Sequence, residues 1–121
     1  METRYADLIK KLTKLTIDGN VEWEKSSTEW QYRLELKSAT FVIDKMQTQI
    51  VEGILYNTSY ELIMYNNRNI EISIAKETIA TNSNENSILY ELYCAAENSY
   101  LKETETIKKV MDELNELDLP I

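Results

Sequence analysis

The chain has no histidine, one cysteine, one proline and two glycines among its 121 residues. The lack of histidine excludes Ser-His and Cys-His nucleophile pairs and removes the commonest metal ligand. A single cysteine, Cys94, cannot form an internal disulfide, which predicts a reducing compartment. Gly19 and Gly53 lie too far apart for a glycine-rich phosphate loop. We therefore predict a protein that is not an enzyme and needs no metal and no cofactor. A hydrolase with paired carboxylates stays open, although no acid spacing favours it.

Long apolar runs are also missing. No stretch approaches the ~18 residues that a membrane-spanning helix needs, and the N-terminus lacks the apolar centre of a secretory signal. The chain is 43% hydrophobic, which is enough for one core. We expect a single α+β domain over residues 1–121, located in the cytoplasm. Asn, Ile, Lys, Glu and Tyr are abundant, which is typical of an AT-rich genome such as that of a low-GC bacterium or its phage.

Positive charge is scarce, and the net charge is −8. Residues 1–20 carry a net charge of +1, whereas residues 76–121 carry −6. So acidic a chain has no general basic field for nucleic acid, so we expect no direct nucleic-acid binding. Its surface suits a basic protein partner, including a protein that handles nucleic acid. The alternative interpretation is that the acidity only keeps the protein in solution.

Three stretches have the apolar spacing of amphipathic helices. Residues 3–16 form the first, and Gly19 suits a left-handed cap after it. Ser87 predicts the N-cap of a second helix that starts at Ile88. Its expected buried stripe is Leu89, Leu92, Tyr93 and Ala96, with Cys94 as a small packing residue. A further apolar stripe consists of Ile107, Val110, Met111, Leu114 and Leu117. Whether residues 88–117 form one helix or two stays open, and Pro120 ends any helix there.

Alternating apolar residues predict a first pair of strands at residues 21–25 and 30–37. If residues 26–29 form the loop, Trp23 faces Tyr32. Both tryptophans then share an apolar face, which continues into the next strand. That face also carries Leu34, Leu36, Phe41 and Ile43. We interpret Trp23 and Trp30 as core anchors and not as a ligand platform, with Trp30 the more exposed because it adjoins the loop.

Further strands are expected at residues 50–56, 60–65 and 70–75, joined by "NTS" and "NNRN". A two-residue turn at 67–68 would pair Tyr65 with Ile70 and place both in the core. The opposite face would carry Tyr56, Tyr60, Leu62 and Met64. It is too apolar for water, so either a helix covers it or it is an interface. We predict an antiparallel sheet of about five or six strands with the N- and C-terminal helices packed on one face.

The stretches "LTKLTIDGNVEWEK", "YELIMYNNRNIEISI" and "ILYELYCAAENSYLKETETIKKVMDEL" resemble a group of small, largely uncharacterised bacterial and phage proteins. Their pattern is an N-terminal helix, a Thr/Gly turn, a Trp-Glu strand, an antiparallel sheet and a LYELA-like C-terminal helix. The matching residues are Thr16, Gly19, Trp23, Glu24, Leu89, Tyr90, Leu92 and Ala95. The turn at 66–69 departs from this pattern. The resemblance implies the fold, and it implies no reaction.

The leading functional hypothesis is a protein-binding module, such as a phage or mobile-element inhibitor of a host nuclease or sensor, in the manner of an anti-CRISPR protein. An immunity protein for a basic toxin is one alternative. A homo-oligomer, in particular a homodimer, that binds a nucleotide is another. The candidate binding residues are Trp30, Tyr56, Tyr60, Leu62, Met64, Glu103, Glu105, Asp112, Glu113 and Glu116.

Overall fold

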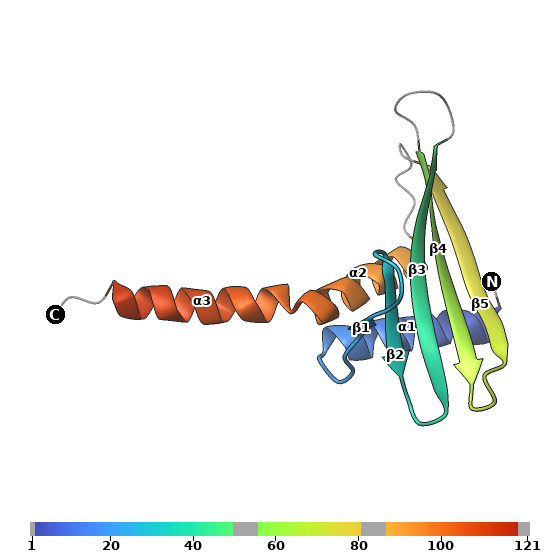
Figure 1. Cartoon of the computed structure of the whole chain (residues 1–121), viewed down its shortest axis with the longest axis horizontal. Coiled ribbons are helices and arrows are strands. Elements are labelled where there is room, and N and C mark those ends of the chain that lie inside the picture. The colour runs from blue at the N-terminus through green and yellow to red at the C-terminus, as the bar shows by residue number, and fades with distance from the viewer. Residues whose placement is uncertain (1, 50–55, 81–86, 119–121) are drawn as a thin grey trace.

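The computed structural model describes residues 2–49, 56–80 and 87–118 (Figure 1). These residues form an α+β fold with one antiparallel sheet, as the sequence predicts. In chain order the elements are α1 (Thr3–Ile17), β1 (Glu24–Lys25), β2 (Gln31–Glu35), β3 (Ala39–Gln49), β4 (Tyr56–Asn66), β5 (Glu71–Ala80), α2 (Ile88–Leu101) and α3 (Glu103–Leu117).

The sheet is an open meander in the order β1-β2-β3-β4-β5, so each strand pairs with its neighbours in sequence. Helices α1 and α2 pack against each other and cover one face of it (Figure 1). We call the sheet with these two helices the body. Helix α3 follows α2 but extends away from the body (Figure 1). The predicted packing of terminal helices on one face is therefore confirmed for α1 and α2.

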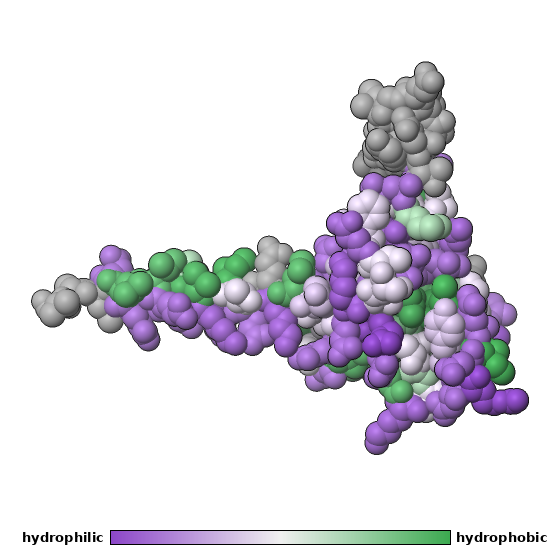
Figure 2. Space-filling view, viewed as in Figure 1, coloured by the Kyte–Doolittle hydropathy of each residue, from purple (hydrophilic) through white to green (hydrophobic). Residues whose placement is uncertain are grey.

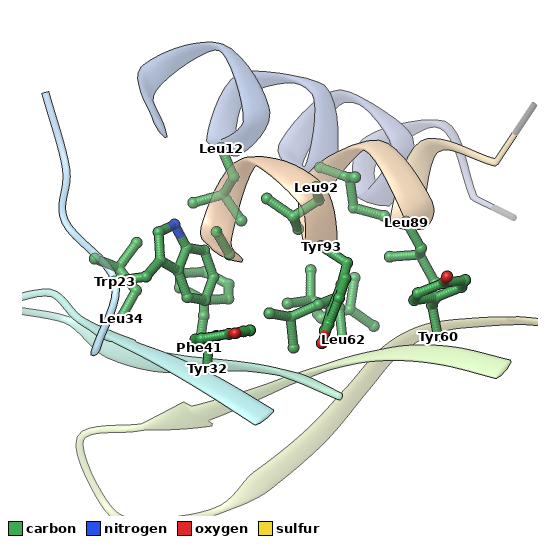
Figure 3. Close-up of a cluster of buried hydrophobic side chains, with 14 residues drawn as sticks. Leu12, Trp23, Tyr32, Leu34, Phe41, Tyr60, Leu62, Leu89, Leu92 and Tyr93 are labelled. Atoms are coloured by element: carbon green, nitrogen blue, oxygen red, sulfur yellow. The ribbon is translucent and has the colours of Figure 1, made fainter. Parts of the chain in front are cut away.

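The core lies between this face and the two helices (Figure 3). Trp23 is 2% exposed, and its indole Nε1 donates a hydrogen bond of 2.9 Å to Thr16 Oγ1. Ile9, Ile43, Leu62, Leu89 and Leu92 are the largest side chains that are fully buried. The predicted stripe of α2 is confirmed, since all four of its residues are buried. Cys94, in contrast, is exposed, so its predicted packing role is wrong.

The first hairpin differs from its predicted register by two residues. Lys25 pairs with Tyr32, because the loop continues to residue 30 and β2 begins at Gln31. A shift of two keeps every side chain on its predicted face, so Trp23 and Tyr32 remain in the core. Trp30 falls in the longer loop and is 41% exposed, so it is not a core anchor. Leu36 lies beyond the end of β2 and is exposed as well.

The hairpin between β4 and β5 has a three-residue loop in place of the predicted two. Asn69 adopts a left-handed conformation (φ 59°), and the Asn66 side chain accepts hydrogen bonds from the backbone N–H groups of Arg68 and Ile70. The extra residue pairs Tyr65 with Glu71, not with Ile70. The partner of Ile72 is consequently Met64, which packs against the core. The predicted core position of Tyr65 is wrong, because it lies on the opposite sheet face.

"NTS", residues 57–59, is a continuous part of β4 and not a turn. All three residues pair with both β3 and β5. The predicted strand at 50–56 lies outside the described residues, apart from residue 56 at the start of β4. Among the described residues the sheet has five strands, which agrees with the expected five or six.

Candidate protein-binding surface

A single residue separates α2 from α3. Lys102 has φ 50° and ψ 35°, the left-handed conformation, so the helix is interrupted at this one residue without an intervening loop. The Lys102 N–H donates to the Asn98 carbonyl over 2.8 Å, and the Thr106 N–H donates to the Lys102 carbonyl over 2.9 Å. A non-glycine residue in this conformation costs roughly 1–2 kcal/mol. The break answers the open question of one helix or two, and beyond it α3 extends away from the body (Figure 1).

The end of α2 is anchored, which fixes where α3 begins. The Ser99 hydroxyl accepts a hydrogen bond of 3.0 Å from the backbone N–H of Trp23. Trp23 in turn bonds to Thr16 in α1, and Thr16 donates to the Leu12 carbonyl over 2.7 Å. The Lys102 ammonium lies 3.5 Å from a carboxylate oxygen of Glu22. The segment at residues 22–23, which is itself bonded to α1, therefore holds the base of α3.

Five apolar residues form one face of α3, and we call them the α3 stripe. They are Ile107, Val110, Met111, Leu114 and Leu117. Their spacing of three and four residues aligns them along the helix. Exposure ranges from 45% for Val110 to 82% for Leu117. In Figure 2 the stripe is visible as a green band along one side of the projecting helix. Such a face on a helix that does not fold back onto its own body is typical of an interaction site.

The physical chemistry of an isolated helix supports this interpretation. A helix of 15 residues is marginally stable in water unless an apolar face is packed. The N-cap residue of α3, Lys102, also makes no side-chain cap hydrogen bond. Burying the remaining exposed half of each stripe side chain would contribute on the order of 1 kcal/mol per residue. Binding a partner would therefore stabilise α3 itself, so its helical structure and its association are coupled.

The sides of α3 away from the stripe are strongly acidic. Glu105, Asp112, Glu113 and Glu116 are all exposed, as the acidic-surface prediction requires. The Lys109 ammonium lies 3.1 Å from a Glu105 oxygen, and this hydrogen-bonded ion pair lowers the pKa of Glu105. Glu103 begins α3, but its side chain lies outside the described part of the structure. The predicted acidic residues and the apolar stripe thus share one helix.

Charge is unevenly distributed along α3. Residues 102–110 carry three lysines and two glutamates, whereas residues 111–118 carry four acidic groups and no basic one. The acidic half is also the C-terminal half, where the helix dipole disfavours negative charge. A positively charged surface beside this half would offset the repulsion among its four acidic groups. It would also offset their unfavourable interaction with the helix dipole. The first half of α3 therefore carries a small positive net charge, and its second half is strongly negative.

The second predicted surface does not exist as a free face. Tyr60 is 4% exposed and Leu62 is 0% exposed, because α2 covers them (Figure 3). Met64 is partly buried against the same core. Of the two predicted alternatives, cover by a helix is the one observed, so these residues are corrected from a binding face to core. Tyr56 begins β4, and its side chain lies outside the described part.

Trp30 lies in a different environment, at an edge of the body. The Lys45 ammonium is 5.5 Å from the centre of the Trp30 ring and 5.6 Å from that of Tyr93. A hollow of about 430 Å³ beside Trp30 is lined by Thr28, Glu29, Asp44, Lys45, Met46 and Gln47. Burial raises the pKa of the Asp44 carboxyl, and nearby Glu61 raises it further. Trp30 is thus separate from the α3 surface.

Within residues 2–49, 56–80 and 87–118, no group of three or more His, Cys, Asp and Glu side chains could hold a metal ion. None of the helices in this part of the chain is both long enough and apolar enough to cross a bilayer. What the described structure offers instead is the apolar and acidic surface of α3.

The sequence predicts both apolar stripes, but it does not predict that the stripe of α2 is buried and that of α3 is exposed. The signal for a projecting helix was the lack of a loop, since neither glycine nor proline occurs between residues 88 and 119. Two helices that fold back on each other need a connection of about 2–8 residues. Without that connection the stripe of the second helix cannot reach the core that the first one covers.

No protein-family model, curated protein or solved structure matches this chain. The surface of α3 is therefore the main guide to its function.

Proposed function

We propose that this protein is a non-enzymatic protein-binding module and that α3 is its binding element. The observation that carries the proposal is the α3 stripe, whose five side chains are 45–82% exposed on a projecting helix. An amphipathic helix of this kind binds by inserting its apolar face into a groove or against another helix. The anchored base of α3 supports the proposal, because it presents the helix from a fixed point.

The acidic flanks of α3 indicate the chemistry of a partner. Four exposed carboxylates in residues 105–116 would complement a basic surface, such as that of a protein that handles nucleic acid. A phage or mobile-element inhibitor of a host nuclease or sensor fits this chemistry. An immunity protein for a basic toxin would use the same surface, so it is the closest alternative within the proposal.

The proposal is tested by a matched pair of variants. Leu114→Glu places a carboxylate on the stripe, and Asn115→Glu places one at the adjacent exposed position away from it. Tagged wild-type protein and both variants are used for affinity capture from host lysate, with quantitative mass spectrometry. We expect wild type and Asn115→Glu to capture the same protein in similar amounts. Leu114→Glu should capture at least tenfold less of it. Equal capture by all three would contradict the proposal.

The dependence of binding on salt separates the contribution of the α3 carboxylates from that of the apolar stripe. If the carboxylates steer a basic partner, raising salt from ~50 mM to ~500 mM should slow association sharply, because the Debye length falls below about 5 Å. Stopped-flow or surface-based kinetics with the captured partner gives this rate. An association rate that does not respond to salt would exclude steering by the acidic residues and leave only the apolar stripe.

A second candidate function is small-ligand binding beside Trp30. The observation that favours it is the 430 Å³ hollow in which the exposed Trp30 ring faces the Lys45 ammonium. An aromatic ring and a cation together suit a nucleotide. Trp23 is buried, so quenching of tryptophan fluorescence by a nucleotide would report on Trp30. A panel of nucleotides that neither quenches fluorescence nor raises the melting temperature would dismiss those ligands.

A further inference from the structure

We infer that the α3 stripe binds the α3 stripe of a second copy of this chain, with the two helices antiparallel. This inference rests on the proposed function, in which α3 is the binding element. It adds the identity of one partner and the geometry of the contact.

The spacing of the stripe is the same in both directions. Ile107, Val110, Leu114 and Leu117 are separated by three, four and three residues, which is the seam of a two-helix coiled coil. Because three-four-three reads identically from either end, a reversed copy places an apolar side chain opposite each of the four. Ile107 then lies level with Leu117 of the second copy, and Val110 lies level with Leu114. Met111 adds an apolar flank beside this seam.

Charge selects the antiparallel arrangement over the parallel one. A parallel pair would place the four acidic groups of residues 111–118 beside the same four of the second copy. An antiparallel pair places them beside residues 102–110, whose three lysines and two glutamates give a net charge of +1. Lys108 then comes level with Glu116 of the second copy. Packed helices have axes about 8–10 Å apart, which is comparable to the Debye length at ordinary salt, so the net charges of facing segments contribute to the choice of orientation.

The position of the bodies favours the same arrangement. Each body lies at the N-terminal end of its α3 (Figure 1). Residues 1–101 carry a net negative charge, so two bodies side by side would repel each other. The 15 residues of α3 span about 22 Å. An antiparallel pair separates the bodies by about this length, whereas a parallel pair would bring them together.

The size of the contact sets the expected affinity. Ten apolar side chains, five from each copy, form an interface at or below the roughly 1,200 Å² lower limit of stable complexes. We therefore expect a weak dimer, with a dissociation constant in the range of about 1–100 μM.

Sedimentation equilibrium of the purified full chain between about 5 and 500 μM tests the pairing. Wild type should pass from monomer to dimer over this range, and Asn115→Glu should behave alike. Leu114→Glu should remain monomeric, a loss of at least tenfold in association. Fluorescence of the buried Trp23 checks that each body stays folded. A monomeric wild type at every concentration, or an undiminished dimer for Leu114→Glu, would overturn the inference.

Disulfide cross-linking tests the orientation. In a Cys94→Ser background, Ile107→Cys and Leu117→Cys are prepared separately, and one of the two carries a tag. Mixing and oxidising them should give the mixed dimer in excess, because positions 107 and 117 are level in the antiparallel pair. Identical positions would be about 15 Å apart along the axis, beyond the ~7 Å that a disulfide can bridge. Efficient 107–107 and 117–117 links would instead show a parallel pair and contradict the inference.

The two proposals fail in different ways. If wild type is monomeric but Leu114→Glu releases a captured protein, self-pairing is wrong and the proposed function stands. If wild type is monomeric and no captured protein depends on the stripe, both are wrong.

Discussion

Helices α2 and α3 are consecutive, nearly equal in length and both amphipathic, but the apolar face of α2 is buried and that of α3 is exposed. The four stripe residues of α2 are at most 3% exposed, whereas the five of α3 are at least 45% exposed. Periodicity thus predicts which face of a helix is apolar, but not what covers that face. In this chain α2 lies over the sheet, whereas α3, beyond the break at Lys102, continues past the edge of the sheet (Figure 1).

The sharpest test of this difference is to shorten one leucine in each helix. Leu92→Ala should lower the free energy of unfolding by about 3 kcal/mol, because Leu92 is fully buried and a cavity remains. Leu114→Ala should change it by less than about 0.5 kcal/mol in dilute protein, as expected for an exposed site. Urea unfolding at about 1 μM, followed by tryptophan fluorescence, measures both. Equal losses would mean that α3 packs on the body.

Alkaline pH should weaken the body through tyrosines that lie in its core. Burial raises the pKa of Tyr60 to about 12, and it raises the pKa values of Tyr32 and Tyr93 as well. Between pH ~10 and ~12 the unfolded chain loses these protons and the folded body keeps them. Stability is therefore full below pH ~10 and falls on the order of 2 kcal/mol as the pH approaches 12.

Urea unfolding at pH 8, 10 and 11 measures this loss, and absorbance at 295 nm follows the tyrosinates. The expected result is that some of the eight tyrosines ionise only as the body unfolds. Ionisation of all eight near pH 10 without unfolding would contradict the prediction.

Trp23→Phe should have a smaller effect, about 1–2 kcal/mol. The substitution removes the indole N–H that donates to Thr16 Oγ1 and leaves that buried acceptor with one bond fewer. Since Trp23 also binds Ser99 through its backbone, the base of α3 should stay in place. Thermal unfolding measures the loss, and Val21→Ala is a neighbouring control at a partly buried position. A loss no larger than that of the control would contradict the role of this bond.

The smallest expected effect is that of Lys102→Gly. Glycine adopts the left-handed conformation without steric cost, but it gains more freedom in the unfolded chain and removes the exposed ion pair with Glu22, so stability should rise by about 0.5 kcal/mol or less. Lys108→Gly is the control, because it places glycine inside α3 and costs about 1 kcal/mol of helix stability. Circular dichroism at 222 nm should therefore fall for Lys108→Gly and not for Lys102→Gly. Equal losses would mean that residue 102 is helical.

Much of the fold could be predicted because its signals are local. Helix α1, the Ser87 cap and the buried stripe of α2 follow from spacing and capping chemistry, and all are confirmed. Register was less predictable, since one extra residue in the loop before Ile70 moved Tyr65 out of the core. The left-handed Asn69 explains this, and the Asn-rich turn allowed two loop lengths. The acidic residues of the site could be predicted from the sequence. That the apolar stripe of the same helix is exposed could not, because this depends on where α3 lies relative to the body.

The one-residue junction at Lys102 also determines how far the end of α3 can move relative to the body. Because the base of α3 is held by Ser99 and Glu22, any change of direction is concentrated at this point. The helix acts as a lever arm of about 22 Å, so a rotation of 10° at Lys102 moves its far end by about 4 Å. A change confined to one pair of backbone torsions would therefore sweep the stripe across a neighbouring surface while the core of the body stays unchanged.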